Sequence, residues 1–120
     1  RCDCIKIDGD VAYVIELKPN NAASRRKGKS QVEGYTDDLN EELQKKCNGK
    51  ESSVMKTLIS KNSSFKKVEE FIPKLDCYTH CPEIDKNGKY KEVSYTWGGL
   101  EDVNYSNNYK IDKADCVETN

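Results

Sequence analysis

The 120-residue sequence has no long hydrophobic run, and its N-terminus does not show the basic-then-apolar pattern of a signal peptide. The lack of a long hydrophobic run excludes a transmembrane helix, which needs about 20 consecutive apolar residues. The chain also lacks an excess of positive charge, because 20 basic residues stand against 21 acidic ones. A uniformly basic nucleic-acid-binding protein is therefore excluded, although a local basic patch is not.

Internal repeats and low-complexity segments are absent too, and 120 residues leave no room for a second catalytic domain. Hydrophobic residues make up 35% of the chain and charged residues 34%. We therefore expect one domain with a thin core and a highly charged surface. The six cysteines exceed what is usual in a cytosolic protein but are fewer than in small disulfide scaffolds, so their number does not fix the compartment.

The clearest strand pattern covers residues 11–17, and two charged residues, Glu16 and Lys18, stand at its end. Successive strand side chains point to opposite faces, so both charges share one face with Ala12 and Val14. The triplet Glu-x-Lys alone is no rarer than chance predicts. On a half-buried strand, however, the carboxylate can hold a divalent metal while the amine orients a water or stabilises developing negative charge. This combination indicates hydrolytic chemistry.

Residues 2–7 predict a strand directly before this one, and Asp8-Gly9 between the two apolar runs is typical of a hairpin turn. With Asp8 and Gly9 as the two central turn residues, Ile7 pairs with Asp10. The first two strands therefore predict an antiparallel hairpin.

The register of this hairpin decides where Asp3 lies. In the predicted register Asp3 pairs with Val14 and lies on the face of Glu16, diagonal to it. A four-residue loop would place Asp3 directly opposite Glu16. A loop with an odd number of residues would turn Asp3 to the other face and separate the two carboxylates.

Residues 24–46 predict an amphipathic helix that ends at the stop signal Asn48-Gly49. The apolar residues at helical spacing are Val32, Tyr35, Leu39 and Leu43. The first turns carry four cations, which oppose the helix macrodipole and so are not explained by helix stability. We interpret these four as candidates for binding substrate phosphate, with a solvated helix face as the alternative. They are Arg25, Arg26, Lys27 and Lys29.

The remaining segments have weaker patterns. Residues 54–60 are consistent with a strand, and residues 64–75 with a short helix. Residues 89–97 alternate as in a strand, and Gly98-Gly99 is expected to turn the chain. Residues 100–120 are rich in Asn, Asp and Tyr and predict a loop or an edge segment.

Three candidate zinc ligands, Cys77, His80 and Cys81, fall within five residues, and Cys47 or Cys116 could complete a tetrahedral site. The spacing is loose and a second paired motif is missing. A disulfide from Cys77 to a distant cysteine and free thiols are the alternatives. Cysteine–histidine catalysis is a further one, but nothing in the sequence activates a particular thiol.

Arg1-x-Asp3, a hairpin, Glu16-x-Lys18 and a following helix together resemble the PD-(D/E)xK nuclease superfamily. The resemblance implies a restriction-endonuclease-like α/β fold, with a mixed β-sheet and flanking helices in a single domain over residues 1–120. It also implies that the usual helix before the first strand is missing. Asp3 and Glu16 would bind Mg²⁺ (or Mn²⁺) that activates water for phosphodiester cleavage, while Lys18 would orient this water or stabilise charge on the phosphate.

The predicted helix adds a second motif of this superfamily. Gln31-Val-Glu-Gly-Tyr35 matches the Gln-xxx-Tyr motif of some of its branches. Because Gln31 and Tyr35 are one turn apart, they share a face and both can reach the substrate or the lysine. With Gly28 before them, the pattern is most similar to restriction-endonuclease-fold toxin domains at the C-terminal ends of bacterial secreted toxins and contact-dependent effectors.

This resemblance implies a Mg²⁺-dependent nuclease, most readily an endodeoxyribonuclease, acting as an antibacterial toxin. Such a domain would be delivered from a larger bacterial toxin, act on nucleic acid in the target-cell cytoplasm, and be blocked by a cognate immunity protein. A chain that starts at Arg1 is consistent with a piece cut from such a carrier. Two alternatives remain: a non-catalytic member of the fold that binds nucleic acid or protein, and a disulfide-stabilised secreted interaction domain.

Overall fold

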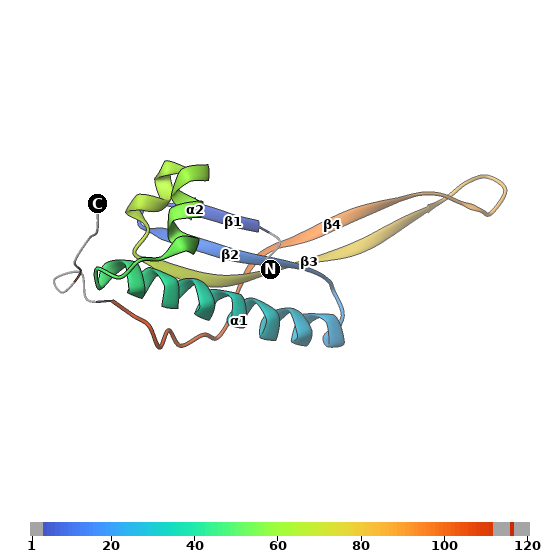
Figure 1. Ribbon diagram of the computed structural model, residues 1–120. Helices are drawn as coiled ribbons and strands as arrows, with labels where there is room; N and C mark the ends of the chain where they lie inside the picture. Colours follow the sequence, from blue (N-terminus) through green and yellow to red (C-terminus); the bar gives the residue numbers. More distant parts are fainter. Residues whose placement is uncertain (1–3, 112–115, 117–120) are drawn as a thin grey trace.

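The computed structural model describes residues 4–111 and Cys116, apart from the side chains of residues 80–83 and 90–94. Asp3, a predicted metal ligand, lies outside these described residues. The chain forms a mixed four-stranded sheet in the order β1-β2-β3-β4, with a long helix alongside it (Figure 1). The predicted mixed α/β sheet with flanking helices is therefore confirmed.

The elements follow one another as β1 (Cys4–Asp8), β2 (Val11–Pro19), α1 (Ala22–Cys47), α2 (Ser53–Lys61), the 3-10 helix η1 (Ser63–Lys67), β3 (Glu70–Ile84) and β4 (Tyr90–Asp102). The hairpins β1–β2 and β3–β4 are antiparallel, whereas β2 and β3 are parallel neighbours. The first two strands and the long helix were predicted within a few residues of these bounds. No helix in the described part of the chain is both long and apolar enough to cross a membrane.

The turn between β1 and β2 lies one residue later than predicted. It is formed by Gly9 and Asp10 instead of Asp8 and Gly9, so Ile7 pairs with Ala12 and not with Asp10. Gly9 has a φ of 63°, a left-handed conformation that glycine adopts without steric cost. Because the pairing moves by two residues, an even number, every described side chain keeps its predicted face.

The segment 54–60 is a helix, so the predicted strand is wrong there. The Ser52 side chain caps α2 by accepting a hydrogen bond from the backbone N–H of Met55. Met55, Leu58 and Ile59 then recur at helical spacing and contribute to the core. The periodicity of a short apolar run does not distinguish a helix from a strand. Here the Ser52 cap favours the helix.

The predicted helix over residues 64–75 is also wrong, because η1 and β3 divide this segment. Burial alternates with a period of two from Phe71 to Cys77, as in a strand with one covered face. Pro73 lies within β3 and pairs with Val14 of the parallel strand β2. Proline is unfavourable inside a helix, and Pro73 is here a strand residue.

The strand predicted over residues 89–97 is confirmed as part of β4, but Gly98-Gly99 does not turn the chain. Both glycines lie inside β4, opposite a register shift between Asp76 and Tyr78. Gly99 has a φ of 89°, and its N–H donates to Asp76 Oδ1 at 3.1 Å. The two glycines therefore form a local bulge that lets β4 continue to Asp102.

The core lies between one face of the sheet and the helices. Ala12 and Val14 of β2, Phe71 and Leu75 of β3 and Val32 of α1 are all fully buried. Residues of α2 and η1 belong to the same cluster, so the helices cover one face of the sheet. Beyond the end of β2, the strands β3 and β4 continue alone as a long two-stranded arm that stands clear of the helices (Figure 1). We call residues 79–96 the arm.

The structure decides between two of the alternatives for Cys77, a disulfide and a free thiol. Cys47, at the end of α1, forms a disulfide with Cys116, 69 residues along the chain. Cys77 is a buried free thiol, so the expected Cys77 disulfide is wrong. Cys47 and Cys116 are bonded to each other, so neither can complete the predicted zinc site as a thiolate. A site at Cys77, His80 and Cys81 stays a prediction, because the side chains of His80 and Cys81 lie outside the described part.

Candidate active site

The carboxylate of Glu16 and the ammonium group of Lys18 lie side by side on the face of β2 that α1 covers. Glu16 is 5% exposed, and its Oε1 lies 3.7 Å from Nζ of Lys18. A buried carboxylate is costly unless a cation balances its charge. The alternation of β2 thus places one buried negative charge and one partly exposed ammonium group together.

A close approach of α1 fixes the stem of Lys18. A Cβ atom on Gly28 would lie 2.7 Å from Cγ of Lys18 and 2.9 Å from Cδ1 of Leu75. Glycine inside a helix costs about 1 kcal/mol relative to alanine, so this residue needs a packing reason. The reason is that the helix backbone presses directly on the Lys18 stem and the Leu75 side chain.

We expect Gly28→Ala to lower the free energy of unfolding by about 1–3 kcal/mol, because the added methyl group overlaps two packed side chains. Gly34 is the matched control in the same helix, since nothing lies within 4 Å of its Cβ position. Gly34→Ala should stabilise the protein by up to about 1 kcal/mol through helix propensity. Urea unfolding of both variants checks this, and equal shifts in the same direction would contradict the packing role of Gly28.

Gln31 lies one turn after Gly28 and has a buried Oε1 with no hydrogen-bond partner among the described residues. Helix α1 runs antiparallel to β2 (Figure 1), so the helix from Gly28 onward runs back toward the start of β2. A buried amide oxygen without a partner is unfavourable by itself, and such groups are frequent at functional sites. Tyr35, one further turn along, is half-buried and packs against the core cluster.

The four cations of α1 are not equivalent. Arg25 Nη2 donates to Glu101 Oε1 at 2.5 Å and its Nη1 donates to Oε2 at 3.0 Å. This bidentate pair ties the start of α1 to β4, and it holds the pKa of Glu101 below its ordinary value. Arg25 therefore already has a structural partner, whereas the other three cations are exposed. These are Arg26, Lys27 and Lys29.

An open hollow with a basic lining lies at the start of α1. Its lining residues are Asn20, Asn21, Ala22, Arg25, Arg26 and Lys29. Backbone N–H groups at a helix start add positive potential to that of the side chains. Since α1 follows β2 after only two residues, the hollow adjoins the strand end that carries Lys18. Lys27 does not line it.

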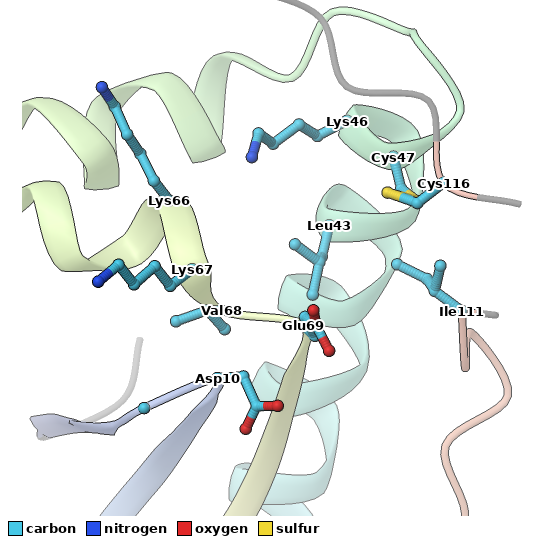
Figure 2. Close-up of a pocket in the computed structure, with 11 residues that line it drawn as sticks. Asp10, Leu43, Lys46, Cys47, Lys66, Lys67, Val68, Glu69, Ile111 and Cys116 are labelled. Atoms are coloured by element: carbon cyan, nitrogen blue, oxygen red, sulfur yellow. A yellow bond between two sulfur atoms is a disulfide. The ribbon is translucent and has the colours of Figure 1, made fainter. Parts of the chain in front are cut away.

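A second pocket lies at the other end of the sheet and contains none of the predicted nuclease-site residues. Figure 2 shows its apolar side chains, Leu43, Val68 and Ile111, together with the disulfide and several lysines. Gly9 and Asp10 of the β1–β2 turn also line it, so it lies by the start of β2. The Glu-x-Lys pair lies near the opposite end of the same strand.

Two residues, Glu101 and Cys77, lie near the pair although the sequence did not place them there. Leu75 of β3 pairs with Glu16 on one side and with Glu101 on the other, so all three share one face. Lys18 pairs with Cys77, and burial raises the pKa of the Cys77 thiol although Arg25 acts in the opposite direction. Burial therefore disfavours the thiolate form of Cys77.

The oxygen donors of this region fit a hard divalent cation. Glu16 offers a carboxylate and Gln31 an amide oxygen, which are groups that Mg²⁺ accepts together with retained waters. Within residues 4–111 and Cys116, as far as their side chains are described, no cluster of three or more His, Cys, Asp or Glu residues could hold a metal. A complete site would need a further ligand, and Asp3 is the predicted one.

Comparison with known proteins gives a match to a family model. Residues 1–55 match the family described as Restriction endonuclease fold toxin 9, a stretch that contains the Glu-x-Lys triplet and the Gln-xxx-Tyr motif. Neither the curated proteins nor the solved structures contain a match to this chain. The resemblance stated from the sequence motifs is thus confirmed, and the mixed sheet with flanking helices is consistent with it.

Proposed function

We propose that this chain is a metal-dependent nuclease that hydrolyses phosphodiester bonds, with DNA as the preferred substrate. The match of residues 1–55 to the family described as Restriction endonuclease fold toxin 9 supports this proposal. The observation that carries the proposal is the buried carboxylate of Glu16 with Lys18 Nζ at 3.7 Å. An acid and an amine at this spacing can serve a hydrolytic reaction.

In this proposal Asp3 and Glu16 would hold Mg²⁺ or Mn²⁺. Asp3 directly precedes Cys4, and Cys4 pairs with Ile15, the neighbour of Glu16. When bound, the cation lowers the pKa of a water and withdraws charge from the phosphate. Glu16 supplies a fixed negative charge from a buried position, so its orientation is set before any cation arrives.

Lys18 and Gln31 would act on the water and the phosphate, and Tyr35, which packs against the core one turn after Gln31, would support them from the same helix face. The Lys18 ammonium group is a donor that can orient the attacking water or stabilise charge that develops on the phosphate. Gly28 holds the Lys18 stem in place, which reduces the freedom of this long side chain. The buried Gln31 oxygen can accept a hydrogen bond from the same water or from the Lys18 amine.

The basic hollow at the start of α1 would bind the substrate backbone. Arg26 and Lys29 line it and are exposed, and Lys27 adds positive charge on the same helix. Arg25 contributes charge from its pair with Glu101 and holds the helix start on the sheet. These cations act on phosphate and carry no sequence preference.

We propose that the nuclease acts as an antibacterial toxin. It would be delivered from a larger bacterial protein and act in the cytoplasm of the target cell. A cognate immunity protein would protect the producing cell by covering the active face. The toxin family that matches residues 1–55 supports this proposal.

Incubation of the 120-residue chain with supercoiled plasmid and Mg²⁺ tests the proposed activity. We expect nicked and linear DNA, with cleavage lost in EDTA and restored by excess Mg²⁺ or Mn²⁺. Parallel reactions with structured RNA and single-stranded DNA determine the substrate class. Cleavage that persists in EDTA would contradict metal dependence, and intact substrates in every reaction would contradict the nuclease assignment.

One observation favours a different function. The Cys47–Cys116 disulfide suits a secreted interaction domain that is stable outside the cell. A folded protein that leaves all nucleic acids intact with Mg²⁺ and with Mn²⁺ would favour this function over the nuclease.

A further inference from the structure

The sheet face turned away from α1 carries exposed apolar side chains near the base of the arm. Four of them are large and at least 37% exposed, which is unusual for neighbouring residues of one sheet face. Together with Tyr78 they form what we call the apolar strip. Its members are Leu17, Tyr78, Tyr95, Trp97 and Leu100.

The strand register shows that these side chains share one face. Leu17 of β2 pairs with Asp76 of β3, which pairs with Leu100 of β4. Glu16 and Leu75 occupy the adjacent positions and point toward the helices. Because side chains alternate along a strand, Leu17, Asp76 and Leu100 point to the opposite face, away from the helices.

The aromatic members of the strip contact one another. The ring centroid of Tyr78 lies 5.1 Å from that of Trp97 and 5.3 Å from that of Tyr95, both in edge-on geometry. Trp97 nevertheless remains 48% exposed and Tyr95 53% exposed. The rings thus form a connected surface that is already ordered, so covering it would cost little side-chain entropy.

The chain has more surface than a compact monomer of its mass. Its accessible area is 8103 Å², whereas about 6,600 Å² is expected for 13.7 kDa, an excess of about 1,500 Å². The radius of gyration is 18.2 Å, against about 13.6 Å for a compact chain of 120 residues. A stable dimer of ordinary size buries about 800 Å² on each partner. This excess belongs to the whole chain, to which the projecting arm contributes, so a dimer of ordinary size would cover the strip together with part of the arm (Figure 1).

The arm gives a second reason for a partner. β2 pairs with β3 only as far as Tyr78, and the arm continues as a ribbon of two strands. A two-stranded ribbon is marginally stable in water unless a further layer or strand supports it. A sheet with an apolar face normally packs that face against another layer.

We propose that two copies of this chain pack apolar strip against apolar strip and form a symmetric dimer. The apolar strip of one copy then faces the apolar strip of the other, as a two-fold axis requires. Packed sheets lie about 10 Å apart, a distance that the Trp97 and Tyr95 side chains can fill. The net charge of −1 gives little repulsion between copies.

Charge argues against nucleic acid as the occupant of this strip. Residues 76–102 contain six acidic residues and three lysines, and no arginine. Platforms that stack single-stranded nucleic acid on aromatic side chains combine them with positive charge. The strip therefore suits an apolar protein surface better than a phosphate backbone.

Sedimentation velocity of the full chain over a range of about 1 to 200 µM, around typical weak-dimer affinities, tests the dimer. We expect the mass to rise from 13.7 kDa toward twice that value. Trp97 is the single tryptophan, so its emission should shift to shorter wavelength over the same concentration range. Trp97→Lys should raise the dissociation constant at least about tenfold, since central tryptophans dominate interfaces.

The matched control is Val54→Lys, because Val54 is 39% exposed but lies on α2, away from the strip. It should dimerise like the wild type, and circular dichroism should show that both variants are folded. Trp97→Lys should keep its plasmid cleavage per chain, because the Glu16–Lys18 pair lies on the other face of the sheet. A failure of the dimer is thus distinguishable from a failure of the nuclease proposal.

Three results would overturn the dimer. The first is a monomer with unchanged Trp97 emission at every concentration. The second is equal dimerisation of the wild type and Trp97→Lys. The third is a monomer whose Trp97 emission shifts only when single-stranded DNA is added.

Discussion

Glu16→Gln is expected to lower kcat for Mg²⁺-dependent DNA cleavage about 100- to 1,000-fold, the usual cost of removing one fixed charge-stabilising group from an active site. Glutamine keeps the size of the buried side chain but removes the charge that the proposed metal needs. The fold should survive because Lys18 is partly exposed and can reach water when its partner is neutral. Initial rates of plasmid nicking, with circular dichroism as a check on folding, measure the effect.

The chain offers a matched control in a second Glu–Lys pair. Glu51 and Lys56 lie 2.8 Å apart on the surface, with side chains 78% and 67% exposed. Glu51→Gln should leave cleavage unchanged, since an exposed ion pair contributes little. If Glu16→Gln and Glu51→Gln cleave DNA equally fast, the buried pair has no catalytic role.

Removal of the disulfide by Cys47→Ser with Cys116→Ser is expected to lower the free energy of unfolding by about 4 kcal/mol. The bond closes a loop of 69 residues. This loop reduces the conformational entropy of the unfolded chain, and so the disulfide stabilises the folded state. Differential scanning calorimetry with and without reductant measures the loss. Reduction of the wild type should reproduce the effect of the double substitution.

The free, exposed thiol of Cys4 supplies the control. Cys4→Ser should leave the melting temperature and its dependence on reductant unchanged. The disulfide lies beside the pocket at the start of β2, away from the Glu16–Lys18 pair, so cleavage well below the melting temperature should persist in the double variant. A double variant as stable as the wild type would show that the bond contributes no stability.

The hairpin and α1 could be predicted because their signals are local. The glycine of the turn, the alternation along β2 and the apolar spacing of the helix each act within a few residues. Asn21 caps α1 by accepting a hydrogen bond from Ser24 N, a contact that also spans only three residues. The same alternation placed Glu16 and Lys18 on one face before any tertiary contact was known.

The rest of the site depends on contacts between distant segments. The parallel pairing of β2 with β3 brings Cys77 beside Lys18, and the Arg25–Glu101 pair joins residues 76 apart. Neither contact has a periodic signature in the sequence. The Cys47–Cys116 disulfide could not be predicted either, because cysteine connectivity does not follow from spacing alone. Short apolar runs such as that of α2 satisfy helix and strand patterns alike.

Calorimetric titration of Mn²⁺ into the wild type and into Glu16→Gln tests most directly whether Glu16 holds a catalytic metal. We expect a saturable isotherm for the wild type and an affinity at least about tenfold weaker for Glu16→Gln, since even supporting residues of metal sites change affinity by that factor. Coincident isotherms for the two proteins, with DNA cleavage by the wild type intact, would contradict the metal-dependent mechanism at Glu16.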